Sequence, residues 1–186
     1  MNVAAKRMSV GEYLAWAEGR PPGERTELVD GEVVAMAPER NRHNLVKTNV
    51  VVALRLAVRE AGVACTVLGD GATVVVDERT AFEPDAVVQC GAPPDPDAVT
   101  VDAPLIVVEV ISPSSRGVDT GRKLGGYMSL PSVRHYLVLD PVRCTVLHHR
   151  RDDGGRIETR QLDGAGGVEL DPPGLAIAVD ELFAGL

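Results

Sequence analysis

The segment from Leu105 to Ile111 constrains the fold most, because it is an apolar run of strand length whose only polar residue is Glu109. Strands that are apolar on both faces occur in sheets covered by helices on both sides, so the run predicts an α/β fold. An unpaired ionised carboxylate among aliphatic side chains is strongly unfavourable. Glu109 must therefore be protonated, paired with a base or bound to a cation, unless it lies at the end of the strand and reaches solvent.

Asp85 is the natural partner of Glu109. Pro84 removes a ladder hydrogen bond and fixes the entry to the strand that runs to Cys90, which predicts Asp85 at the rim of the sheet. If the two strands are neighbours, a cation could lie between the carboxylates, and oxygen ligands suit Mg²⁺ or Mn²⁺ better than zinc. The alternative is an aspartate that only starts a strand after a turn.

A helix predicted over residues 118–130 carries Asp119, Lys123 and Tyr127 at successive i+4 positions on one face. The ordinary explanation for Lys123 is a surface ion pair with Asp119, which contributes little to stability. The functional explanation places the Lys123 ammonium beside the metal, where it orients a water nucleophile and neutralises charge developing on a phosphate.

The N-terminal part of the chain predicts a short helix followed by a hairpin. Ser9 and Glu12 have the spacing of a capping box, and Asp30-Gly31 is a preferred pair for a two-residue type I′ turn. Alternation along the hairpin places Glu27 and Glu32 on one surface. They either extend the acidic cluster or form the solvated face of an edge hairpin.

A long helix is predicted from Asn41 or His43 to Gly62. His43, near its N-terminus, could contact a phosphate or only cap the chain end. Residues 148–151, His-His-Arg-Arg, are a second candidate for phosphate contact, although such charges at a strand end are commonly only solubilising. The acidic, glycine-rich segment 151–167 is predicted to be a loop or a mobile hairpin.

Composition limits the class of protein. A length of 186 residues with 45% hydrophobic residues predicts one domain spanning residues 1–186, with a core that needs no cofactor. The net charge of −8 argues against binding nucleic acid through bulk electrostatics, and 3% aromatic residues argue against a base-stacking platform. Neither excludes a nuclease, because such an enzyme binds metal through carboxylates and needs only local basic groups.

The cysteines and the apolar segments predict where the protein is found. Cys65, Cys90 and Cys144 are odd in number and far apart along the chain, which favours core thiols in a reducing cytoplasm. No segment approaches the ~20 apolar residues of a membrane span, and no signal peptide is evident. A soluble, cytoplasmic protein without a membrane partner is expected.

The motifs, in order, resemble the Uma-two family of restriction endonuclease-like proteins within the PD-(D/E)xK superfamily, over nearly the whole chain. The elements that carry the resemblance are DGEVVAMAP, His43, Pro84-Asp85, PLIVVEVISPSS, Asp119, Lys123, Tyr127 and HYLVLDP. The resemblance implies a central mixed β-sheet flanked by helices, with an N-terminal helix and hairpin, and a homodimer. It also implies a metal site on Asp85 and Glu109. The lysine of the superfamily signature is absent, because Ile111 stands two residues after Glu109, so its role would pass to Lys123.

These observations lead to one functional hypothesis and two alternatives. The hypothesis is an endonuclease that hydrolyses DNA with Mg²⁺ or Mn²⁺ as cofactor, with Asp85 and Glu109 as metal ligands and Lys123 as the catalytic cation. The predicted supporting residues are Glu27, Glu32, His43, Asp119 and Tyr127. One alternative is a nuclease-like fold that acts as a binding or assembly module with little or no catalysis. The other is a metal-free structural protein in which Glu109 pairs with Arg116 or Lys123.

Overall fold

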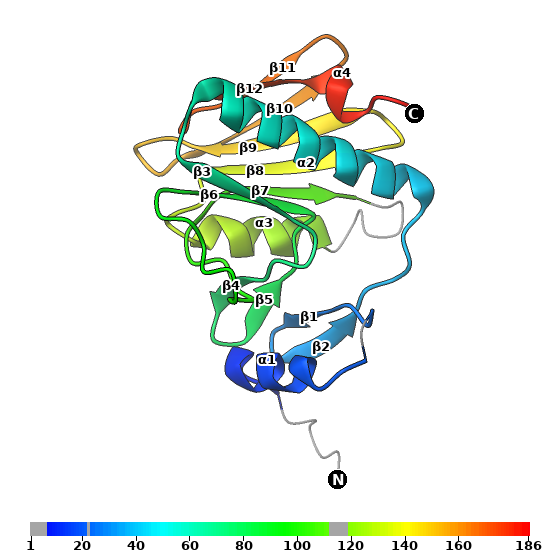
Figure 1. Ribbon diagram of the computed structural model, residues 1–186, viewed down its shortest axis with the longest axis vertical. Helices are drawn as coiled ribbons and strands as arrows, with labels where there is room; N and C mark the ends of the chain where they lie inside the picture. Colours follow the sequence, from blue (N-terminus) through cyan, green and yellow to red (C-terminus); the bar gives the residue numbers. More distant parts are fainter. Residues whose placement is uncertain (1–6, 22, 112–118) are drawn as a thin grey trace.

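The core of the molecule is a six-stranded mixed sheet. The computed structural model describes residues 7–21, 23–111 and 119–186 (Figure 1). The strand order is β10-β9-β8-β7-β6-β3, and only β7 and β8 run parallel to each other. The strands are β3 (Cys65–Gly69), β6 (Ala86–Cys90), β7 (Pro104–Val110), β8 (His135–Asp140), β9 (Thr145–Arg151) and β10 (Ile157–Asp163). The predicted central mixed sheet is confirmed, and so is the pairing of β6 with β7.

Helices cover both faces of this sheet, as the apolar β7 run predicts. Helix α2 (Asn41–Ala61) packs its Val50 and Leu54 against the face that contains Ile106 and Val108. Helix α3 (Asp119–Ser129) packs against the opposite face, where Val107 lies. Figure 1 shows α2 crossing the strands and α3 beside β7. Successive side chains of β7 therefore alternate between the core beneath α2 and the core beneath α3.

A second, four-stranded sheet carries the N-terminal elements. Its order is β2-β1-β5-β4, and helix α1 packs against it. The elements are α1 (Val10–Glu18), β1 (Thr26–Val29), β2 (Glu32–Ala35), β4 (Val74–Asp77) and β5 (Thr80–Phe82). The capping box at Ser9 and Glu12 forms, and Asp30 and Gly31 both have positive φ, 51° and 81°, as a type I′ turn requires. The predicted register of the hairpin is confirmed.

The C-terminal segment closes the core on the α2 side. Strands β11 (Gly167–Leu170) and β12 (Leu175–Ala178) form a hairpin, followed by α4 (Val179–Leu182). Leu170, Ile177 and Leu182 join the core cluster that contains α2. Within the described residues, no helix has the length and apolar content needed to cross a membrane.

Two expectations from the sequence were wrong, and a third was right in one of its two alternatives. Cys65 and Cys90 form a disulfide, because antiparallel pairing of β3 with β6 places them directly opposite each other, 25 residues apart along the chain. His148 and His149 lie buried inside β9 and are not at an exposed strand end. The segment predicted as a loop or a mobile hairpin contains strand β10, which forms an antiparallel hairpin with β9, so the hairpin alternative holds and the loop alternative does not.

Candidate functional site

A cavity of about 490 Å³ opens beside the end of β7. Its walls come from the β1–β2 hairpin, the segment that leads into α2, the first turn of α2, the ends of β7 and β8, and α3. Both Asp85 and Glu109 line this cavity, as do Glu27, His43 and Lys123. Two carboxylates from adjacent strands thus face one space, which is the placement that the sequence predicts.

Asp85 is held at the start of β6 by the sheet and by helix α2. Its main-chain N–H donates to the Val108 carbonyl at 3.0 Å, and its Oδ2 accepts from the Val110 N–H at 2.6 Å. Its Oδ1 lies 2.9 Å from the Nζ of Lys47, and its Oδ2 lies 3.5 Å from the Nε2 of His43. The Asp85 side chain is only 5% exposed, so these neighbours replace solvent.

Glu109 is held from the other side of the sheet by helix α3. Its Oε1 accepts from the Tyr127 hydroxyl at 2.7 Å and from the Lys123 Nζ at 2.9 Å. The same Nζ lies 2.8 Å from the Oε1 of Glu27. Glu27 lies on β1, so the four-stranded sheet also contributes a residue to the site. Lys123 is only 12% exposed, so its ammonium lies inside the site and not on the surface of the molecule.

The two carboxylates differ in their proton affinity. Burial raises the pKa of the Glu109 carboxyl to about 7, because Lys123 offsets only part of the burial and of the repulsion from Asp85 and Glu27. Burial also acts to raise the pKa of Asp85, but His43, Lys47 and the Val110 N–H together lower it below its usual range. Asp85 is therefore ionised at neutral pH, whereas Glu109 is poised near its midpoint.

The lysines remain charged despite their burial. Burial acts to lower the pKa of Lys123, but the Glu109 and Glu27 carboxylates raise it above the ordinary lysine value. The pKa of Lys47 is raised in the same way, burial being outweighed by Asp85 and by hydrogen bonds to other acids. Both ammonium groups are thus permanent positive charges inside the site.

Lys47 is a site residue that the sequence interpretation missed. It is 7% exposed and pairs with Glu39 at 2.8 Å and Asp70 at 2.7 Å in addition to Asp85. Arg25 joins the same network through ion pairs with Glu39, Asp70 and Glu83. A signal was present in the sequence, because Lys47 is one helical turn beyond His43, on a helix that is otherwise apolar toward the sheet.

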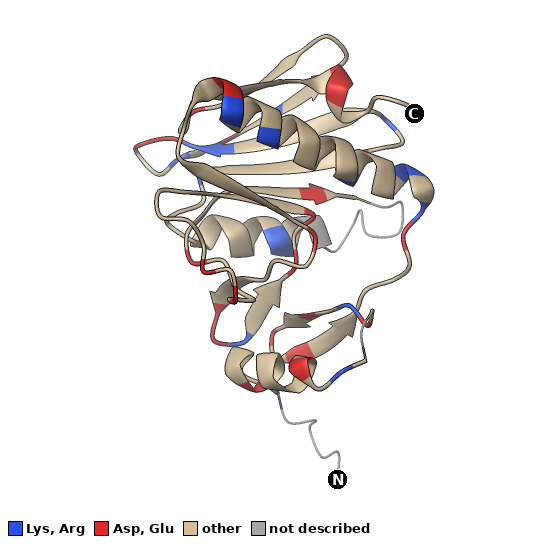
Figure 2. Ribbon diagram, in the orientation of Figure 1, with Lys and Arg blue, Asp and Glu red and all other residues tan. Residues whose placement is uncertain are grey.

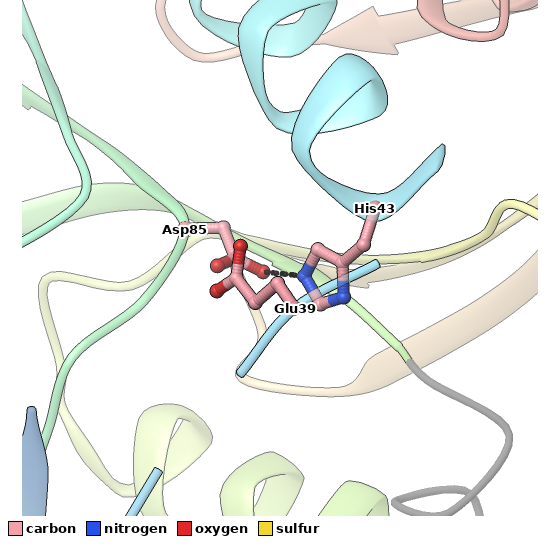
Figure 3. A group of neighbouring side chains, drawn as sticks. All are labelled: Glu39, His43 and Asp85. Carbon is pink, nitrogen blue, oxygen red and sulfur yellow. Dashed lines mark ion pairs between the residues drawn. The ribbon is translucent and has the colours of Figure 1, made fainter. Parts of the chain in front are cut away.

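Glu39, His43 and Asp85 form a group of potential metal ligands. One ligand atom from each residue lies within 4.8 Å of the others. Figure 3 shows the three side chains converging, with His43 from the first turn of α2 and Asp85 from the start of β6. A nitrogen and carboxylate oxygens are donors that divalent cations accept, so the residues present fit such an ion.

Basic residues lie at the mouth of the cavity. Arg40, Arg42 and Arg122 line it, and Arg122 also lies 3.7 Å from the Asp30 carboxylate. Figure 2 shows basic positions along α2 and acidic positions in the loops near β4 and β5. The chain, with a net charge of −8, thus has local basic groups beside the site.

The structure does not bring every predicted residue into the site. Glu32 is 69% exposed, pairs loosely with Arg7 at 3.8 Å and does not line the cavity. Tyr127 and Glu27 lie in the site, through their contacts with Glu109 and Lys123. The side chain of Asp119 and the whole of Arg116 lie outside the described residues.

Known proteins match this chain over most of its length. Two uncharacterized proteins of Synechocystis sp. are similar to it. The first, slr1290, is 28% identical over 182 residues, and the alignment covers 97% of this chain and 93% of that protein. The second, sll1609, is 27% identical over 148 residues, covering 78% of this chain and 82% of that protein.

A solved structure shows the same fold. It is the crystal structure of a protein from Anabaena variabilis described as "a putative nuclease belonging to DUF820", with a TM-score of 0.75 and 16% sequence identity. The alignment covers 95% of this chain and 98% of that one. At this identity the match establishes the restriction-endonuclease-like fold alone. The model of the Uma2 family, described as "Putative restriction endonuclease", matches residues 10–180, and the chain therefore belongs to the Uma2 family.

Proposed function

We propose that the protein is a metal-dependent endonuclease that hydrolyses phosphodiester bonds of DNA, with Asp85 and Glu109 as ligands of Mg²⁺ or Mn²⁺. The observation that carries the proposal is the convergence of these two buried carboxylates, from paired strands, on one cavity that Lys123 also lines. Membership of a family of restriction endonuclease-like proteins supports the same reaction class.

The charge balance of the site favours a cation. Among the described residues, the acids outnumber the bases in the connected network of ion pairs around the cavity. The acids are Glu27, Glu39, Asp70, Glu83, Asp85 and Glu109, and the bases are Arg25, Lys47 and Lys123. A bound divalent cation supplies positive charge against the scissile phosphate and lowers the pKa of a water molecule.

Lys123 takes the part of the missing signature lysine. Ile111 cannot carry a charge, but α3 delivers the Lys123 ammonium to the same carboxylate from the neighbouring element. Because its pKa is raised, Lys123 stays protonated at neutral pH. It can therefore neutralise charge that develops on the phosphate and orient a nucleophile, but it does not serve as a general base.

Two further residues position the acids. The Tyr127 hydroxyl donates to Glu109 Oε1, which fixes the orientation of that carboxylate. Glu27 holds Lys123 from the β1 side, and its Oε1 also accepts from the Glu83 N–H at 3.0 Å. Such contacts keep ligands in place for chemistry, as outer partners do in known metal sites.

The test is cleavage of supercoiled plasmid DNA with Mg²⁺ or Mn²⁺. We expect the wild type to nick the plasmid and the Glu109→Gln variant to lose this activity while remaining folded by circular dichroism. Glu32→Gln, a change of the same kind outside the cavity, is the matched control and retains cleavage. A wild type that cuts no nucleic acid with either ion contradicts the proposal.

One observation favours a second function, a binding or assembly module. Both central carboxylates already have a lysine partner within 2.9 Å, so each has a counter-charge without a metal. Calorimetric titration with Mg²⁺ separates the two functions, because a pure interaction module has no reason to bind the ion at Asp85 and Glu109. The predicted homodimer remains a proposal, which light scattering coupled to gel filtration tests.

A further inference from the structure

We propose that the cavity contains a second cation position, formed by Glu39, His43 and Asp85, that binds a first-row transition-metal ion in preference to Mg²⁺. This inference rests on the proposed function, because Asp85 belongs to both positions. It adds an ion on the α2 side of Asp85, with a nitrogen ligand that the Asp85–Glu109 pair lacks.

The geometry brings the three ligands together from two elements. Glu39 immediately precedes the N-cap residue of α2, and His43 lies in the first turn of this helix. These two residues therefore approach Asp85, just before β6, from the same end of α2 (Figure 3). The three ligand atoms lie within 4.8 Å of one another. Small side-chain movements would close these separations to the span of a single ion with bonds of about 2.1 Å.

The ring of His43 has an unsatisfied atom at this point. Its Nε2 is buried and makes no hydrogen bond, the Asp85 Oδ2 being 3.5 Å away. A buried polar atom without a partner destabilises the fold, and such an atom in a native fold calls for an explanation. With its ring proton on Nδ1, His43 would offer the Nε2 lone pair as a ligand beside the Glu39 and Asp85 carboxylates.

The surrounding charges can accept a divalent ion. Four carboxylates, those of Glu39, Asp70, Glu83 and Asp85, share two bases, Arg25 and Lys47. An ion of charge +2 bound to Glu39 and Asp85 balances this excess. Lys47 then keeps Asp70, and Arg25 keeps Asp70 and Glu83, so neither base loses its last carboxylate partner.

The ligand set determines the class of ion. Mg²⁺ prefers oxygen donors, whereas an imidazole nitrogen raises the affinity for first-row transition metals. The Glu39–His43–Asp85 position is therefore expected to discriminate against Mg²⁺, while the Asp85–Glu109 pair, with oxygen donors alone, accepts it. Mn²⁺ is the suitable probe, because it tolerates both donor types and is paramagnetic.

The decisive experiment is pulsed electron paramagnetic resonance of the full-length protein with Mn²⁺ alone. We expect a ¹⁴N modulation from a coordinated imidazole in the wild type, which His43→Gln removes. Calorimetry is expected to show about a tenfold loss of Mn²⁺ affinity at this position in His43→Gln, with a smaller loss of Mg²⁺ affinity. Glu32→Gln, an exposed acid outside the cavity, is the matched control and should change neither measurement.

A second variant keeps the test valid if His43→Gln is poorly folded. Glu39→Gln retains the ring and is expected to weaken Mn²⁺ binding while keeping any ¹⁴N modulation from residual bound ion. Bound Mn²⁺ without ¹⁴N modulation in the wild type overturns the inference, and so does a modulation that persists in folded His43→Gln.

Failure of this inference can be told apart from failure of the proposed function. Glu109→Gln is expected to lose DNA cleavage but to keep the Mn²⁺–imidazole signal. A wild type that shows the signal and cuts no DNA supports the cation position and contradicts the nuclease. A wild type that cuts DNA but gives no ¹⁴N modulation with bound Mn²⁺ contradicts only the cation position.

Discussion

Two regions of this molecule bury ionisable side chains, and burial has opposite consequences in them. In the cavity, Asp85, Lys47 and Lys123 keep their charges because each has an oppositely charged partner within 3 Å. In β8 and β9, His135 and His148 hydrogen-bond to each other at 2.9 Å, and burial lowers the pKa of each to about 4. No carboxylate is paired with either ring among the described residues, so both are neutral.

The histidine pair satisfies its hydrogen bonds without charge. We assign the proton of His135 to Nε2, which donates to the Pro172 carbonyl at 2.9 Å, so that its Nδ1 accepts from His148 Nε2. The pair thus ties β8 and β9 to the loop before β12. The comparison teaches that burial by itself neutralises a group, and that the cavity holds charge only because the fold supplies counter-charges from four separate elements.

Removal of a counter-charge from the cavity should have the largest effect. Lys47→Met is expected to lower the free energy of unfolding by about 3 to 5 kcal/mol, because it leaves the buried Asp85 carboxylate without its lysine partner. Urea denaturation at pH 7 in the absence of divalent cations measures this loss. Arg55→Met, an exposed position on the same helix, should stay within about 0.5 kcal/mol of the wild type. Equal stability of the two variants would contradict the role of Lys47.

Acid should destabilise the histidine region. Because the folded-state pKa of His135 and His148 is depressed below the usual 6.5, the unfolded chain takes up protons first as the pH falls. Stability is therefore fully present above pH 6.5 and is lost as the pH falls towards 4, by about 2 kcal/mol after allowance for partial solvent screening.

The double variant His135→Phe/His148→Phe isolates this effect. Its free energy of unfolding, measured in urea between pH 7 and 4, should fall less steeply than that of the wild type. Parallel curves for the two proteins would mean that the rings titrate normally in the folded state.

A hydrogen bond to a charged acceptor should matter more than one to a neutral acceptor. Tyr127→Phe removes the donor to the Glu109 carboxylate and is expected to cost about 1.5 kcal/mol. Tyr13→Phe removes a donor to the Thr26 carbonyl and is expected to cost about 1 kcal/mol or less. Thermal denaturation of both variants in alkaline buffer, above the Glu109 pKa of about 7, makes the comparison, and a reversed order would show that Glu109 does not carry charge in the folded state.

The smallest effect is expected outside both regions. Glu32→Gln changes an acid that is 69% exposed, so stability should remain within about 0.5 kcal/mol of the wild type. Plasmid cleavage and Mn²⁺ affinity should also be unchanged. A tenfold change in either would place Glu32 in the site, contrary to its position on the hairpin.

Local signals in the sequence predicted much of the fold. The hairpin register follows from Asp30-Gly31, the end of α2 from Gly62, and the helix-covered sheet from the apolar run around Glu109. For the segment of strand β10, a loop and a hairpin both stayed open, because six of its seven residues are exposed and it has no apolar alternation to detect. That residues 1–186 form a single domain remains a prediction.

The candidate site was predicted only in part. Asp85 and Glu109 stand out because proline and aliphatic neighbours surround them in the sequence. Glu39 and Asp70 lie outside helices and strands, and only the folded chain brings them to Lys47. The disulfide was missed for the same reason, because opposition of Cys65 and Cys90 depends on the register of β3 and β6.

The hydrogen bond from the Val110 amide to Asp85 assigns different tasks to the two oxygens of one carboxylate. Oδ2 completes the join between the start of β6 and the end of β7, so it belongs partly to the architecture of the sheet. Oδ1 pairs with the Lys47 ammonium and is the oxygen that an incoming cation could contact in its place. Asp85→Asn keeps one oxygen acceptor, so it can preserve the hydrogen bond from the Val110 amide while it removes the negative charge. This substitution therefore separates the contribution of Asp85 to folding from its contribution to ion binding.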